Sequence, residues 1–309
     1  MPIIGKPLQN SDSIQVVRLD VALLERGLTD SRSKAQRLIA DGKVSVNGVT
    51  VTKASTKVCC DDVITADRGD GYVSRGAYKL VGAFEQFAAA GLRSAQGLRC
   101  LDIGASTGGF CDVLLRNDVA QVIALDVGHG QLDPKIAHDD RIVEMSGVNI
   151  RDVYVDDLPY RPEMIVSDVS FISLTYVIPV IARIAAPQAQ IVLLVKPQFE
   201  VGKGNLGKNG IVESQELREQ ALASVVACAE CNGLDVRATT VSPIEGTHGN
   251  IEYLLHIRKP EEISEEKLAL TEHEAESALQ TIIEEKTGLS YTPEWDAVIK
   301  GIVDNSHTL

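Results

Sequence analysis

Residues 98–259 alternate between short apolar segments and segments with helical spacing, and this alternation constrains the fold more than any other feature of the chain. Continuous apolar segments of this length are typical of strands buried on both faces of a sheet, and helices usually connect parallel strands. The pattern predicts an α/β domain with a doubly wound sheet. Its seven predicted strands are LRCLDIG, QVIALDV, RIVEMSG, MIVSDVS, IVLLVKP, LDVRATTVSP and IEYLLHIRK.

Residues 16–66 show a different pattern, typical of a small α+β domain. Apolar residues with helical spacing begin at Leu19, and Asp30 or Ser31 is placed to cap a second helix that stops at Gly42. The alternating VSVNG that follows ends in an Asn-Gly pair, which is a strong hairpin signal. We therefore expect two helices followed by short strands.

Composition and charge divide the 309 residues into five expected parts. The net charge is −13, and the last fifty residues hold twelve acidic residues against three basic ones. The rest of the chain is therefore close to neutral, and its basic groups can still form a nucleic-acid-binding face. The parts are a disordered N-terminus (1–15), the α+β domain (16–66), a glycine-rich linker (67–73), the α/β domain (74–259) and an acidic extension (260–309). Within this extension, residues 264–288 have the pattern of a mostly polar helix.

The cysteines and the apolar segments point to a reducing compartment. No apolar run reaches the roughly 20 residues that span a bilayer, and the first residues lack the pattern of a signal peptide. The cytoplasm is therefore the expected location, and the six scattered cysteines are expected to be free thiols. Cys228 and Cys231 form a single CxxC without a second pair, so we predict no metal site.

A glycine-rich turn follows the first predicted strand of the α/β domain. In LDIGASTGGF the strand ends at Asp102, and three glycines after it let the backbone approach a ligand at the start of a helix: Gly104, Gly108 and Gly109. The spacing is not GxGxxG, so the dinucleotide fingerprint is absent. The next strand ends at Asp126, where a carboxylate can accept hydrogen bonds from a ribose. These features predict a nucleoside-containing cofactor. The alternative is that the two acidic strand ends and the glycines have only a structural role.

Two further strands end in residues that are costly to bury. MIVSDVS ends its strand at Asp168, and IVLLVKP ends its strand at Lys196. In open α/β sheets the carboxyl ends of the strands line one crevice, so these two residues are expected to meet Asp102 and Asp126 there. A single lysine at such a place is usually a surface group, but this combination indicates a catalytic site.

The predicted second helix of the α+β domain carries a run of basic side chains. A solvated helix face is one explanation of such a run. However, RLDVALLERGLTDSRSKAQRLIADGKVSVNG resembles the S4 domain, a small RNA-binding module. The resemblance implies contacts with RNA that depend on backbone charge and shape. The residues expected to contact RNA are Arg18, Arg32, Lys34, Arg37 and Lys43, together with Arg75, Lys203 and Lys208 of the α/β domain.

Five motifs in the α/β domain follow one another as in a known family. VSRGAYKL, LDIGASTGGF, SDVSFISL, VLLVKPQFE and GNIEYLLHI resemble the TlyA family of haemolysin-like, S4-containing ribosomal RNA 2′-O-methyltransferases with an FtsJ-type fold. The likeness covers about residues 16–258, although Tyr72 stands where the family usually has tryptophan. It implies a Rossmann-like, S-adenosylmethionine-dependent methyltransferase domain with a mostly parallel seven-stranded sheet.

The resemblance also implies roles for individual residues. The expected catalytic residues are Lys79, Asp168, Lys196 and Glu252, with Lys196 as the base and Glu252 holding Lys79 or the ribose. The expected contacts with S-adenosylmethionine are Asp102, Gly104, Ser106, Thr107, Gly108, Gly109, Phe110, Asp126, Val127 and Asp168. Because a ribose hydroxyl is a poor nucleophile, a base and an aligned methyl donor suit this chemistry.

The expected activity is 2′-O-methylation of a ribose, in a cytidine of 16S or 23S ribosomal RNA or of both. We expect a monomer that acts on ribosomal RNA or ribosomal subunits and not on membranes. One alternative is a ribosome-assembly factor that binds RNA and cofactor without catalysis. Another is a membrane-active haemolysin, for which the sequence offers neither a spanning segment nor a strongly amphipathic basic helix.

Overall fold

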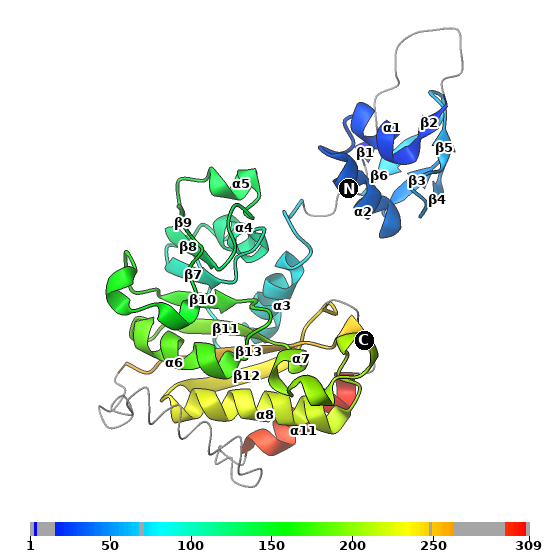
Figure 1. Ribbon diagram of the computed structural model, residues 1–309. Helices are drawn as coiled ribbons and strands as arrows, with labels where there is room; N and C mark the ends of the chain where they lie inside the picture. The colour runs from blue at the N-terminus through cyan, green and yellow to red at the C-terminus, as the bar shows by residue number, and fades with distance from the viewer. Residues whose placement is uncertain (1–2, 5–15, 68–70, 247–248, 262–293, 307–309) are drawn as a thin grey trace. The chain divides into compact units, whose positions relative to one another are not determined.

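The computed structural model divides the chain into two compact units, Met1–Tyr72 and Val73–Leu309 (Figure 1). The structure describes residues 3–4, 16–67, 71–246, 249–261 and 294–306. The polar helix predicted at 264–288 and the disorder predicted for most of 1–15 lie outside these residues. Among the described residues, no helix is long and apolar enough to cross a bilayer.

The first unit packs two short helices on small sheets, as the sequence predicts for an α+β domain. Ser31 caps α2 because its Oγ accepts a hydrogen bond from the Lys34 backbone N–H. The hairpin turn lies at Asn47 and Gly48, whose φ values of 52° and 81° suit a two-residue turn. The elements are β1 (Ile3–Ile4), β2 (Val17–Arg18), α1 (Leu19–Glu25), α2 (Arg32–Ala40), β3 (Val44–Val46), β4 (Val49–Thr50), β5 (Lys57–Val58) and β6 (Ile64–Ala66).

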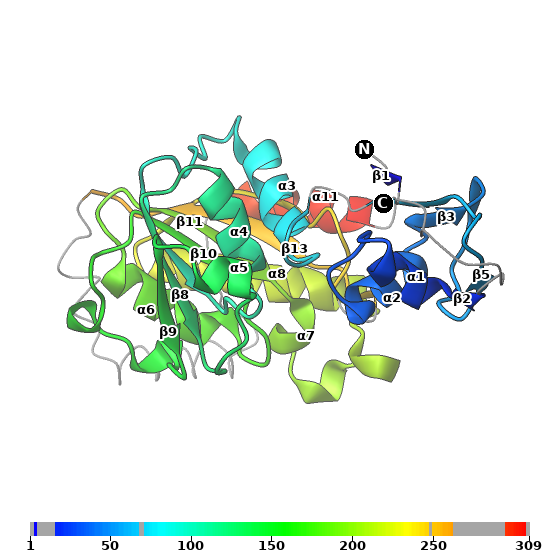
Figure 2. The same ribbon diagram turned by 90° about the horizontal axis from the view of Figure 1, so that it is seen from above.

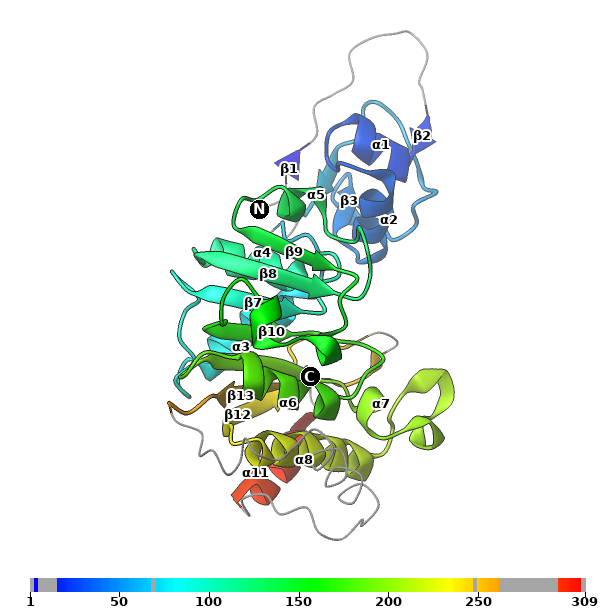
Figure 3. The same cartoon turned by 60° about the vertical axis from the view of Figure 1, so that its left-hand side comes forward.

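The second unit contains a seven-stranded sheet in the order β12-β13-β11-β10-β7-β8-β9, which Figure 3 shows along its length. Strands β11, β10, β7, β8 and β9 run parallel, whereas β13 is antiparallel to both of its neighbours. The predicted mostly parallel sheet is confirmed. The strands are β7 (Arg99–Ile103), β8 (Gln121–Asp126), β9 (Ile142–Ser146), β10 (Met164–Ser167), β11 (Gln190–Val195), β12 (Asp235–Val241) and β13 (Tyr253–Arg258).

Helices cover both faces of this sheet, as in other doubly wound domains. Figure 2 shows α3 and α4 on one side and α6 and α8 on the other. Strands β10 and β11 are buried along their whole length because each lies inside the sheet between these layers. The helices are α3 (Ala77–Phe87), α4 (Gly109–Arg116), α5 (Pro134–Ala137), α6 (Leu174–Ile184), α7 (Pro197–Glu200), α8 (Gln215–Cys231) and α11 (Glu294–Asn305).

Helix α11 shows that part of the acidic extension belongs to the core of the second unit. It packs against α8 and β12, and it buries Ile299 and Val303, which are 3% and 0% exposed. These two residues lie one helical turn apart, so the helix has one apolar face. The acidic composition of 260–309 predicts a separate extension, but α11 packs into the core of the second unit.

Candidate active site

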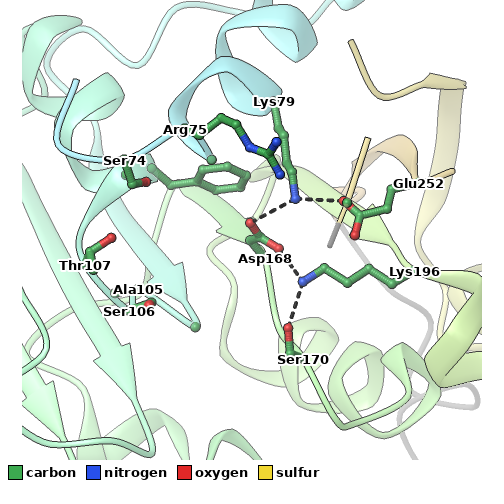
Figure 4. A pocket seen from close by; sticks show the side chains of 15 residues that line it. Ser74, Arg75, Lys79, Ala105, Ser106, Thr107, Asp168, Ser170, Lys196 and Glu252 are labelled. Atoms are coloured by element: carbon green, nitrogen blue, oxygen red, sulfur yellow. Dashed lines mark hydrogen bonds and ion pairs between the residues drawn. The ribbon is translucent and has the colours of Figure 1, made fainter. Parts of the chain in front are cut away.

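Four charged side chains form a continuous chain at one edge of the sheet (Figure 4). The Lys196 Nζ lies 2.6 Å from an Asp168 carboxylate oxygen, and the other Asp168 oxygen lies 3.5 Å from the Lys79 Nζ. The Lys79 Nζ in turn donates a hydrogen bond to Glu252 at 2.7 Å. The charges therefore alternate along the series Lys196, Asp168, Lys79 and Glu252, which we call the charged tetrad.

The tetrad is largely removed from water. The side chains of Lys79 and Lys196 are each 9% exposed, and that of Glu252 is 2% exposed. Burying an isolated charge is costly, but here each ammonium contacts a carboxylate and the set is neutral overall. The Lys196 Nζ also donates a hydrogen bond to the Ser170 Oγ at 2.9 Å. The arrangement holds the two lysine amino groups at fixed positions in a site that is shielded from water.

Sheet topology explains why residues far apart in sequence meet here. Asp168 and Lys196 each follow directly after neighbouring parallel strands, β10 and β11, so both lie at the same sheet edge. Strand β13 runs in the opposite direction and begins with Tyr253 opposite Val195, which places Glu252 at that edge too. Lys79 reaches the edge from the first turn of α3.

The tetrad lines a cavity of about 270 Å³ that continues onto the glycine-rich turn after β7. Gly104 has φ +82°, and a Cβ atom there would lie 3.2 Å from the Asp168 backbone oxygen. A Cβ atom at Gly109 would collide with the Ser74 side chain. Glycine is therefore required for the turn to pass this closely. The cavity is lined by Ser74, Arg75, Gly76, Lys79, Gly104, Ala105, Ser106, Thr107, Gly109, Phe110, Asp168, Ser170, Lys196, Gly246 and Glu252.

Most of the residues expected to bind the cofactor lie at or beside this cavity. Gly104, Ser106, Thr107, Gly109, Phe110 and Asp168 line it, whereas Gly108, Asp126 and Val127 do not. Asp126 lies next to them, because its carboxylate accepts hydrogen bonds from the Ser106 and Gly128 backbone N–H groups, each at 2.8 Å. Val127 is 65% exposed just beyond this strand end. The turn and Asp126 thus form one connected surface.

Asp102, which the resemblance implies as a contact of the cofactor, does not line the cavity. It is 1% exposed, and its carboxylate accepts a hydrogen bond from the Cys111 Sγ of α4 at 3.0 Å. Burial raises the pKa of Asp102 to about 7. Because side chains alternate across a strand, Asp102 faces the layer between β7 and α4 and does not join the other strand-end residues in the cavity.

Several residues at the site were not identified from the sequence. Ser74 and Ser170 line the cavity, and Phe171 follows Ser170 with φ +66° and a side chain that is 92% exposed. The Phe171 ring packs against Phe199 with ring centroids 5.2 Å apart. A positive φ is uncommon for a bulky non-glycine residue, and an aromatic ring this exposed loses the stabilisation that burial would give. The only hint in the sequence is the position of Phe171 soon after Asp168.

The arginines expected to bind RNA in the S4-like unit are organised by a buried carboxylate. Asp20 is 0% exposed and accepts hydrogen bonds from Arg18 at 2.9 and 3.1 Å, from Arg32 at 2.9 Å and from Gln36 at 2.9 Å. Arg18 and Arg32 keep side-chain exposures of 39% and 54%, so both still present donors to solvent. Asp20 was not identified from the sequence.

The other basic residues predicted to bind RNA lie at accessible positions. Lys34 is exposed and pairs with Asp30 at 3.6 Å, Arg37 is exposed on α2, and Lys43 is half-buried. In the second unit, Arg75 lines the tetrad cavity, and its guanidinium lies 3.4 Å from the Glu245 backbone oxygen. Exposed Lys203 and Lys208 lie in the loop after α7 and do not line the cavity.

The Asp20 contacts predict a pH-dependent stability of the first unit. Hydrogen bonds from Arg18 above all hold the pKa of Asp20 well below its usual value. The Asp20 carboxyl has a pKa of about 4 in the unfolded chain. Its contribution to the stability of the folded unit is therefore fully present above this pH and decreases as the pH falls below it. We expect Asp20→Asn to accelerate amide hydrogen exchange in residues 16–66 by roughly tenfold or more at pH 7, because charged hydrogen bonds are lost.

The same exchange measurement at pH 3 should show a smaller difference between Asp20→Asn and the wild type. Asp30→Asn is the matched control, because Asp30 is exposed and has one long ion pair. Equal protection in wild type and Asp20→Asn at pH 7 would contradict the stabilising role of Asp20.

Comparisons with known proteins agree with this geometry. Residues 72–259 match the family model of FtsJ-like methyltransferases, and residues 17–64 match the S4 domain. The chain is 43% identical over 243 residues to the 16S/23S rRNA (cytidine-2′-O)-methyltransferase TlyA of Mycobacterium tuberculosis, covering 78% of this chain and 89% of that protein. It is also 43% identical over 245 residues to Hemolysin A of Brachyspira hyodysenteriae, covering 78% and 99%.

A solved structure of a protein described as a hemolysin from Streptococcus thermophilus has the same overall fold. It superposes with a TM-score of 0.67 at 34% identity, covering 96% of this chain and 97% of that one. The two domains thus occur together in relatives that match most of the chain. The protein belongs to the TlyA family, in which an S4 RNA-binding domain precedes an S-adenosylmethionine-dependent, FtsJ-like methyltransferase domain.

Proposed function

We propose that this protein transfers a methyl group from S-adenosylmethionine to the 2′-hydroxyl of a cytidine ribose in ribosomal RNA. The observation that carries the proposal is the charged tetrad, which lies in one cavity with the glycine-rich turn. The named activity of the Mycobacterium tuberculosis relative supports cytidine as the target and ribosomal RNA, 16S and 23S, as the substrate. The protein acts as a monomer in the cytoplasm.

The cavity suits S-adenosylmethionine. The close backbone turn at Gly104 leaves room for a ligand, and Asp126 can accept hydrogen bonds from ribose hydroxyls beside Ser106. Asp168 can face the positive charge of the sulfonium. When bound, S-adenosylmethionine supplies the methyl group from its sulfonium sulfur. After transfer, this sulfur is left as a neutral thioether.

Lys196 accepts the proton of the attacking 2′-hydroxyl in the proposed reaction. The base must be unprotonated at that moment, and Asp168 and Ser170 hold its Nζ at 2.6 and 2.9 Å so that it stays at the reacting oxygen. Lys79 is fixed by Glu252, and it can donate a hydrogen bond to the ribose or keep Asp168 in place. Much of the rate enhancement comes from holding the oxygen in line with the methyl group.

Phe171 offers a stacking surface for the base of the target nucleotide. Its exposed ring is next to Ser170 of the cavity, and stacking on aromatic rings stabilises bases that have left a helix. We expect Phe171→Ala to raise the KM for ribosomal RNA by about tenfold, since one base–aromatic stack contributes about 1–3 kcal/mol. Binding of S-adenosylmethionine should not change.

Tyr176→Ala is the matched control for Phe171→Ala, because Tyr176 is also an exposed aromatic residue but lies on α6, with its ring under the Arg151 guanidinium. Steady-state kinetics with ribosomal subunits and calorimetry with the cofactor provide the two readouts. An unchanged KM for RNA in Phe171→Ala would exclude the stacking role.

The proposed function is tested by transfer of labelled methyl from S-adenosylmethionine to separated 30S subunits, 50S subunits and naked ribosomal RNA. Label in a 2′-O-methylcytidine is the expected result, and the labelled fraction identifies 16S RNA, 23S RNA or both. Binding of RNA and cofactor without any transfer would favour the assembly-factor alternative. Leakage from liposomes in place of transfer would favour the haemolysin alternative.

A further inference from the structure

The partly buried carboxylate of Glu200 joins the two chain segments that carry Asp168 and Lys196 of the tetrad. Glu200, the last residue of α7, accepts a hydrogen bond from the Ser173 Oγ at 2.5 Å and one from the Leu174 backbone N–H at 2.9 Å. Ser173 is the N-cap of α6. Glu200 therefore occupies the start of α6, where free N–H groups and the helix dipole favour a negative charge.

These contacts close a ring around the catalytic groups. One arm runs from Asp168 along the loop to Ser173, and the other arm runs from Lys196 through α7 to Glu200. The arms are joined at one end by the 2.6 Å Asp168–Lys196 ion pair and at the other end by Glu200. Ser170 joins them between these ends by accepting the Lys196 hydrogen bond. Neither arm can shift without disturbing the other.

The loop between Asp168 and Ser173 needs such support. Phe171 lies within it with a positive φ of 66° and with 92% of its side chain exposed, so little packing holds this residue in place. Unfavourable backbone conformations persist only where surrounding contacts impose them. The loop is held by the Phe171–Phe199 ring pair, by the packing of Val169 and Ile172 against the core, and by the hydrogen bonds from Ser173 and Leu174 to Glu200.

A carboxylate is a costly choice for a simple helix cap at this position. Burial raises the pKa of Glu200 to about 7, although the Ser173 and Leu174 hydrogen bonds act in the opposite direction. In the same unit, α8 is capped by the Ser214 side chain alone, which accepts from the Leu217 backbone N–H at 3.3 Å. The difference indicates that Glu200 does more than cap α6, because it connects the segment after Lys196 to the segment after Asp168.

We propose that Glu200 is a positioning residue that holds Asp168, Ser170 and Phe171 in register with Lys196. This inference rests on the proposed function, because it assigns a role within the same site. Glu200 does not line the cavity, and it acts through Ser173 and Leu174.

The test compares Glu200→Gln with Ser214→Ala in the full-length protein. Glutamine keeps the size of the side chain but has one acceptor oxygen in place of two, so one of the two donors loses its partner. Ser214→Ala removes a helix cap that has no connection to the tetrad, and it reports the effect of lost capping alone. For Glu200→Gln we expect kcat to fall by about 10- to 100-fold, because a misplacement near 1 Å can cost this much.

Further readouts separate positioning from general destabilisation. The Kd for S-adenosylmethionine and the thermal midpoint of Glu200→Gln should stay close to those of Ser214→Ala. Acetylation of Lys196 by acetic anhydride, measured by mass spectrometry, should be faster in Glu200→Gln than in the wild type. The reason is that the Lys196 Nζ is no longer held by Asp168 and Ser170 in this variant. In a double-mutant cycle, adding Ser173→Ala to Glu200→Gln should cause little further loss.

The acetylation measurement also keeps the inference testable without the proposed activity. If the wild type transfers no methyl group, the proposed function fails, and the reactivity of Lys196 still reports whether Glu200 positions it. Wild-type kcat in Glu200→Gln together with unchanged Lys196 reactivity would overturn the inference. An equal loss of kcat in Ser214→Ala would also overturn it.

Discussion

Lys196→Ala is expected to lower kcat for methyl transfer by about 10³-fold or more, because the variant loses the base and the group that aligns the attacking oxygen. The Kd for S-adenosylmethionine should change little, since the glycine-rich turn and Asp126 are untouched. Single-turnover transfer of labelled methyl to ribosomal subunits measures the first effect, and calorimetry measures the second.

Lys196→Arg distinguishes a base from a fixed positive charge. Arginine can contact Asp168, but it does not lose its proton in proteins, so we expect it to be as inactive as alanine. Lys300→Ala is the control, because Lys300 is exposed on α11. Near wild-type transfer by Lys196→Arg would show that the positive charge, and not proton transfer, is what the reaction needs.

Glu252→Ala is expected to destabilise the second unit strongly and to abolish transfer. The substitution leaves Lys79 buried with only the 3.5 Å contact to Asp168. Removing one partner of a buried ion pair typically costs about 3–5 kcal/mol of unfolding free energy. Urea denaturation measures this loss, with Glu85→Ala on the exposed side of α3 as the control.

The double variant Lys79→Met/Glu252→Leu separates stability from function. Two apolar side chains of similar size need no charged partner, so we expect most of the lost stability to return. Methyl transfer should remain absent, because the tetrad is broken. A double variant that is both stable and active would show that Lys79 and Glu252 serve the fold alone.

Local sequence patterns predicted many of the elements correctly. The buried strands β10 and β11 follow from short runs of apolar residues bounded by polar ones, and the α2 cap and the Asn47-Gly48 hairpin follow from short-range hydrogen bonding and backbone preference. Each of these elements depends on interactions between residues that are close in sequence, so the local sequence is enough to predict it. Helix α11 was not predicted, because its apolar face is short. Packing against α8 and β12 buries this face, and the sequence pattern does not show that contact.

The sequence by itself determined which residue types end the strands, and with them the acidic, basic and glycine-rich character of the candidate site. Only the tertiary structure decided which of these side chains meet. The reversed direction of β13 brings Glu252 to Lys79, 173 residues away, and the alternation along β7 turns Asp102 into the core. The hydrogen bond between Glu200 and Ser173 depends on how α7 and α6 pack. Contacts between distant segments are set by packing and strand order and not by the local sequence pattern.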